Sequence, residues 1–109
     1  MNTPNSVAIH VLVGSEYPSL EVVLADGQEP EGTVRSDVIA AMLAARPDGA
    51  VIDRDDAPRL DLEGAAPSEN TIALALGRLV TGLVRRGYAV TVREVALLYA
   101  HDPGEAPDA

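Results

Sequence analysis

A carboxylate that ends an apolar strand pattern is the first candidate for chemistry in this sequence. Val90 and Val92 share one face of a predicted strand, and Glu94 is the next residue on that face. A buried carboxylate without a partner is costly, so Glu94 needs one. Its two acceptor oxygens match paired N–H donors, as on an arginine or the edge of a 2-amino-4-oxopyrimidine. The pattern therefore indicates either a substrate-binding residue or a solvated or ion-paired one.

His10 is the candidate for acid–base catalysis. It lies on the face of a predicted strand, 6–13, opposite to the valine stripe, and its ordinary pKa near neutrality suits proton exchange. Asp53 could orient it, provided that the fold brings the two together. One imidazole does not make a zinc site, and carboxylates such as Glu16 with His101 would have to complete it. We therefore expect no bound metal and no cofactor.

A predicted helix from Glu69 to Arg86 positions Glu94. Ser68 can cap this helix, and Glu69 is favourable in its first turn. Both residues are candidates for a binding pocket, although helix-start chemistry alone explains them as well. Two internal glycines are costly in a helix and usually permit close backbone approach. The apolar positions expected to pack on the sheet are Leu76, Leu79, Val80 and Leu83.

The remaining pattern predicts an α+β protein with two helices on one face of an antiparallel sheet. The expected elements are strands at 6–13 and 20–25, a helix opened by Ser36-Asp37, a helix from Glu69, and strands at 88–94 and 95–101 that could be one bent strand. Residues 50–67 are expected to form a connection, in which four aspartates make a solvated acidic loop or, less well, a calcium loop. One domain, 6–101, with flexible tails at 1–5 and 102–109, fits this order.

Composition excludes several classes of function. The net charge of −9 argues against nucleic acid and anionic membranes as partners. With no cysteine and no lysine, the chain can form neither a thiolate nucleophile nor a Schiff base. It has no phenylalanine or tryptophan, so its core is thin and subunit association would stabilise it. No apolar run has the length of a spanning helix, and we expect a cytoplasmic protein.

Four segments resemble the 6-pyruvoyltetrahydropterin and 6-carboxytetrahydropterin synthase family. They are PSENTIALALGRLV, VTVRE, EPEGTVRSDVIAAM and SVAIHVL. The resemblance implies the tunnelling fold (T-fold), a ββααββ unit whose four-stranded antiparallel sheets assemble into homotrimers or homohexamers. It also implies that Glu94 anchors a pterin ring and that His10 stands at the family's first zinc histidine.

Several positions depart from the family pattern. The segment VGSEYPSLEV lacks the family's second and third zinc histidines, and the nucleophilic cysteine is absent. Arg54 follows Asp53 where the family has a catalytic histidine, and Val95 replaces a threonine after Glu94. The resemblance thus implies a retained ring-binding corner without the metal and proton-transfer groups.

Two hypotheses follow. In the first, the protein binds a pterin- or purine-like heterocycle at a subunit interface, through Glu94 with Ser68 and Glu69. Chemistry through His10 and Asp53 would then be a zinc-independent lyase, cyclase or isomerase reaction. In the second, the protein is a non-catalytic T-fold module that assembles or regulates a larger complex. Aldolase chemistry of the dihydroneopterin type is disfavoured by the absence of lysine.

Overall fold

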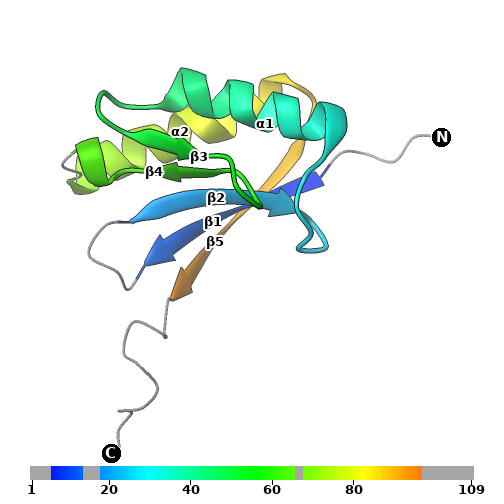
Figure 1. Ribbon diagram of the computed structural model, residues 1–109, viewed down its shortest axis with the longest axis horizontal. Helices are drawn as coiled ribbons and strands as arrows, with labels where there is room; N and C mark the ends of the chain where they lie inside the picture. Colours follow the sequence, from blue (N-terminus) through cyan, green and yellow to red (C-terminus); the bar gives the residue numbers. More distant parts are fainter. Residues whose placement is uncertain (1–5, 14–17, 66–67, 97–109) are drawn as a thin grey trace, which may run out of the picture.

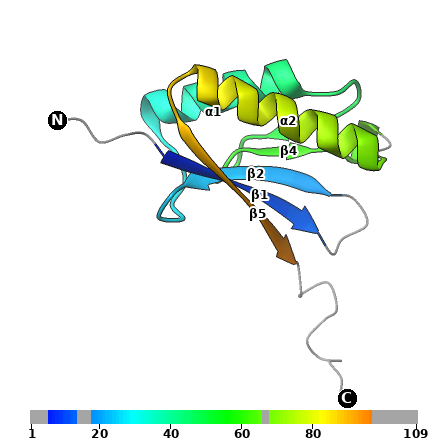
Figure 2. The ribbon, with the colours of Figure 1, turned by 180° about the vertical axis from the view of Figure 1, so that it is seen from behind.

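Two helices cover one face of a five-stranded sheet in this computed structural model, which describes residues 6–13, 18–65 and 68–96 (Figures 1 and 2). The elements in chain order are β1 (Ser6–Val13), β2 (Ser19–Leu24), α1 (Gly32–Ala45), β3 (Val51–Asp53), β4 (Arg59–Asp61), a 3₁₀ turn (Glu63–Ala65), α2 (Glu69–Arg85) and β5 (Ala89–Ala96). No helix within these ranges is long and apolar enough to cross a bilayer.

The strand order β3-β4-β2-β1-β5 explains why both helices share a face. β1 is antiparallel to β2 and parallel to β5, while β4 is antiparallel to both β2 and β3. Helix α1 therefore joins the parallel strands β2 and β3, and α2 joins the parallel strands β4 and β5. Such crossovers are almost always right-handed. Because the two crossovers run in opposite directions from antiparallel strands, one hand places both helices on the same side.

The α+β class with two helices is confirmed, but the expected four-stranded antiparallel sheet and the order ββααββ are wrong. Residues 50–67 contain the hairpin β3–β4 and not only a connection. Three-residue strands are too short to show an alternating pattern, and their stability comes from pairing with β2. The chain after the second helix forms one strand, β5, whose parallel pairing with β1 makes the sheet mixed. The expected strand end at 97–101 and both tails lie outside the described residues.

The core lies between the sheet and the helices, and it is built from aliphatic residues. From the sheet, Val7, Ile9 and Leu20 are almost completely buried, as the alternating pattern predicts. From α2, Leu79 and Leu83 are fully buried, and Leu76 and Val80 pack against them at the edge, which confirms the predicted face. The buried positions of α1 are those expected: Val38, Ala41, Met42 and Ala45.

The ends of the helices follow local rules with one exception. Ser68 caps α2, its hydroxyl accepting from the Thr71 amide at 3.2 Å. At the other end, Gly87 donates to the Val84 carbonyl and Tyr88 to the Leu83 carbonyl, a Schellman motif. Helix α1 stops before Pro47 as predicted, but it begins at Gly32, four residues before Ser36. Its first turn has no side-chain cap, which is why the Ser36-Asp37 signal misplaced the start.

Two contacts join the helices to each other and to β5. Gly82 of α2 lies against α1, where a Cβ on it would stand 3.3 Å from the Ala41 Cβ, so this glycine permits the close approach expected of it. The Tyr88 hydroxyl donates to Asp37 Oδ2 of α1 at 2.6 Å. Burial, this hydrogen bond and the negative charge of Asp37 together raise the pKa of Tyr88 to about 12.

Candidate functional site

A pocket of about 360 Å³ opens between the first half of α2 and the sheet edge formed by β5. Figure 2 shows the cause: α2 ends and β5 begins at the turn that joins them, and the two elements diverge away from this turn. The uncovered side chains form the walls, so Val92 is 43% exposed although it faces the helix layer. The apolar walls are Val11, Ile72, Ala73, Leu76 and Val92. We call this the α2–β5 pocket.

Two carboxylates, Glu69 and Glu94, lie in the wall of this apolar pocket. Glu69 comes from the first turn of α2, and Glu94 comes from β5, opposite Val11 in the parallel register with β1. Within the described ranges, neither side chain makes an ion pair or hydrogen bond. The two residues that the sequence placed at opposite ends of one segment thus meet at one cavity.

Ser68 stands apart from the pocket wall. Its hydroxyl accepts from the Thr71 amide and lies 3.1 Å from the Thr71 hydroxyl, which occupies its hydrogen-bonding capacity at the helix start. Ser68 therefore acts on the pocket indirectly, because the cap fixes the turn that carries Glu69.

His10 lies on the sheet face opposite to the helices. Its Nδ1 is 3.6 Å from Glu21 Oε1, its neighbour on β2, and Arg93 stands beside it on β5. Glu94 and Arg93 are consecutive on a strand, so their side chains point to opposite faces of the sheet. The structure therefore does not bring His10 to the α2–β5 pocket.

Asp53 is on the same open face as His10, but Arg59 and Glu21 stand between them. The register aligns one residue from each strand across the whole sheet: Asp53, Arg59, Glu21, His10 and Arg93. Asp53 Oδ2 accepts from Arg59 Nη2 at 2.9 Å, and Asp53 Oδ1 accepts from the Asp55 amide at 2.9 Å. The hypothesis that Asp53 orients His10 is therefore wrong, because Glu21 holds the adjacent position.

The acidic segment after β3, residues 54–56, is held in place by hydrogen bonds from Arg35 to its backbone carbonyls and does not form a cation site. Arg35 of α1 donates to the carbonyls of Asp56 and Arg54, which fixes the hairpin under the helix. No group of three or more histidine, aspartate or glutamate side chains among the described residues is arranged to hold a metal ion. Glu16 and His101 lie outside those residues.

The two carboxylates of the pocket were predicted from the sequence, but the apolar residues that line the rest of the pocket were not predicted as site residues. Ile72 and Leu76 were visible only as members of the apolar arc of α2, and Val11 only as one valine of β1. The pairing of Glu21 with His10 could have been found, since both face the same side of the predicted hairpin. The pairing of Arg59 with Asp53 could not be predicted, because the strand that carries Arg59 was not predicted.

Comparisons of the chain with protein-family models, with curated proteins and with solved structures find no match.

Proposed function

We propose that the protein binds a flat nitrogen heterocycle with adjacent N–H donors, of the pterin or purine kind, in the α2–β5 pocket. The observation that carries the proposal is a pair of solvent-exposed carboxylates, Glu69 and Glu94, which have no protein partner in the described structure and lie at the wall of an open, otherwise apolar pocket. The volume of about 360 Å³ is within the range of small-molecule sites, roughly 300–1,000 Å³.

The chemistry of the wall favours this class of ligand over others. A heterocycle presents apolar faces to Val92 and Leu76, and its N–H edge donates to the carboxylates. A purely apolar ligand would leave the carboxylates desolvated and unpaired, and an anionic ligand would be repelled by them. Glu94 is the principal anchor in this proposal, and Glu69 is the second acceptor.

The resemblance of VTVRE and PSENTIALALGRLV to the tetrahydropterin synthases supports the same ligand class. It supports the ligand and not the T-fold sheet, since the element order differs. A zinc-independent lyase, cyclase or isomerase reaction in this pocket would have to use Glu69 or Glu94 for proton transfer and not His10. The position of His10 on the opposite sheet face favours the second candidate, a non-catalytic module that binds the heterocycle and responds to it.

The site would be completed by a second subunit. The pocket opens beside β5, which lies at the edge of the sheet with one side unpaired within the described structure. Edge strands are prone to pair with other chains, and such pairing would cover the pocket. The thin core and the resemblance to the tetrahydropterin synthases, which implies trimer-based assemblies, lead us to propose a homotrimer or homohexamer. A monomeric mass by light scattering at micromolar concentration would contradict it.

Calorimetric titration with pterin, guanine and hypoxanthine tests the ligand class. Pterin and guanine carry the 2-amino group beside a ring N–H, and hypoxanthine lacks that amino group. We expect binding of the first two and a loss for hypoxanthine, because one of the paired donors is gone. Equal affinity for all three compounds would mean that the carboxylates do not bind the paired N–H donors of the heterocycle.

Glu94→Gln tests the anchor. The variant loses a charge-assisted contact worth on the order of 1.5–3 kcal/mol, so pterin affinity should fall about 10- to 100-fold while the melting temperature changes little. Glu21→Gln is the matched control, because it removes a carboxylate from the other sheet face. Unchanged affinity in Glu94→Gln would show that this carboxylate is structural.

A further inference from the structure

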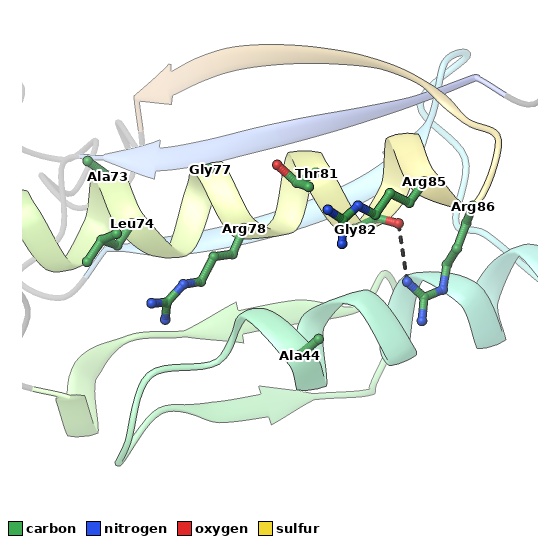
Figure 3. Close-up of a pocket in the computed structure, with 9 residues that line it drawn as sticks. All are labelled: Ala44, Ala73, Leu74, Gly77, Arg78, Thr81, Gly82, Arg85 and Arg86. Carbon is green, nitrogen blue, oxygen red and sulfur yellow. Dashed lines mark hydrogen bonds between the residues drawn. The ribbon is translucent and has the colours of Figure 1, made fainter.

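A second concave surface lies on the outer side of the helix layer, where α1 runs beside α2 (Figure 3). We call it the arginine groove, and its volume is about 510 Å³. The lining residues that matter here are Ala44 of α1 and Leu74, Gly77, Arg78, Arg85 and Arg86 of α2 and its C-terminus. This surface adjoins the α2–β5 pocket at Ala73, which lines both, and the proposed function makes no use of its arginines.

The charge of the groove is opposite to that of the chain. The sequence carries a net charge of −9 with eight arginines, and three of these arginines line the groove. Within the described part of the chain, Arg78 and Arg85 have no acidic or carbonyl partner, and Arg86 donates to the Gly82 carbonyl of its own helix at 3.2 Å. The guanidinium groups are therefore available to an acidic partner.

The length of the groove favours an extended partner over a small anion. Leu74 and Arg86 are twelve positions apart, which corresponds to roughly 18 Å along a helix, and Arg78 and Arg85 are about 10 Å apart along the axis. Figure 3 shows Arg78 and Arg86 reaching from α2 towards α1, at separate points along the groove. Carboxylates spaced along a partner helix match this spacing of the arginines.

The floor of the groove is apolar and lacks side chains that fill it. Leu74 of α2 is 56% exposed, and it lines the groove together with Ala44 of α1. Gly77 is a glycine inside a helix, which destabilises the helix relative to alanine. Unlike Gly82, it makes no close packing contact, since a Cβ built on it would meet nothing within 4 Å. A partner helix that packs closely at this point would explain the glycine.

We propose that the arginine groove docks an acidic amphipathic helix of a partner protein. The apolar stripe of that helix packs between Ala44 and Leu74 over Gly77, and carboxylates two turns apart pair with Arg78 and Arg85. Helix-in-groove binding of this kind takes its affinity from the apolar stripe and its orientation from the charges.

The test measures fluorescence anisotropy with a labelled 18-residue helical peptide of leucine, alanine and glutamate that has one apolar face. A peptide of the same composition, scrambled so that no face is apolar, and an oligoglutamate of the same charge are the comparison probes. We expect the amphipathic peptide to bind at least tenfold more tightly than either. No binding at millimolar peptide, or equal binding of all three, would overturn the proposal.

The variants locate the binding. Arg85→Glu and Arg78→Glu should each lower the affinity for the amphipathic peptide at least tenfold. Arg54→Glu, the same charge change in the β3–β4 loop, should weaken it less than twofold. An equal loss of peptide affinity in Arg54→Glu would show that the effect comes from the net charge of the chain, and it would overturn the proposal.

Gly77→Leu separates binding from folding. The site is open, so the variant should fold with a melting temperature at or above that of the parent chain, and the new side chain should block the peptide. Retained peptide binding in folded Gly77→Leu would contradict the proposed contact. Sedimentation of the protein alone is the second arm: self-association that Gly77→Leu abolishes would assign the groove to a second copy of this chain instead.

Discussion

Helix α2 separates two concave surfaces of opposite character. On its sheet side, the first half of the helix and the diverging strand β5 border the open α2–β5 pocket, with Glu69 and Glu94 in the wall. On its outer side, the arginine groove runs to the C-terminal end of the helix with Arg78 and Arg85. Glu69 lies in the first turn of the helix and Arg85 in its last turn, as the helix dipole favours.

The two surfaces differ in how the chain forms them. The pocket exists because a strand turns away from a helix and leaves side chains uncovered, so its shape depends on the sheet. The groove exists because two helices are held together through Gly82 and Ala41, so its shape depends on helix packing. One helix can therefore carry two binding sites whose supports can be disturbed separately.

Leu79→Ala should break both surfaces, because it removes the fully buried anchor of their shared helix. We expect a loss of about 2–5 kcal/mol in the free energy of unfolding, measured by urea denaturation, together with weaker binding of both pterin and the acidic peptide. Leu74→Ala is the matched control on the same helix. It is 56% exposed, so it should leave stability and pterin binding nearly unchanged.

Gly82→Leu should break the groove and spare the pocket. The side chain would enter the contact with Ala41 and push the helices apart, at a cost of about 1–3 kcal/mol by urea denaturation. Peptide binding should be lost and pterin affinity kept. If pterin affinity fell as steeply, the two surfaces would not be independent.

Tyr88→Phe should weaken the junction of α1 with the turn before β5, because the hydrogen bond to Asp37 is lost. We expect the free energy of unfolding to fall by about 1 kcal/mol. The pKa of Tyr88 is raised to about 12, so the folded chain holds its proton where the unfolded chain releases it. Stability from this group is complete below pH 10 and is lost as pH rises from 10 towards 12. Denaturation curves at several pH values should show this fall in the parent chain and not in Tyr88→Phe.

Zinc removal should have the smallest effect. Only His10 stands at a position that resembles a zinc ligand of the tetrahydropterin synthases, and its Nδ1 lies 3.6 Å from Glu21 Oε1. We expect well under one zinc per subunit by elemental analysis after dialysis, and no change in melting temperature with chelator. A stoichiometric metal that disappears in His10→Ala would sink this prediction and restore a metal-based mechanism.

Local structure could be predicted from the sequence wherever the residue pattern was long enough. The alternation of β1, the apolar arc of α2 and its two ends were predicted because strand pairing, burial and capping each leave a repeated or positional signal. The nomination of Glu94 with Glu69 came from the same patterns, and the structure places both in one pocket.

Tertiary structure alone decided the sheet order and what each side chain meets. Pairing with β2 makes strands of Val51–Asp53 and Arg59–Asp61, which have no alternation of their own. The crossover through α2 brings β5 beside β1 in a parallel pairing of strands that are far apart in the sequence. The register of this pairing puts Glu94 opposite Val11 and leaves His10 on the other face of the sheet. Such contacts are non-local, so no short stretch of sequence encodes them.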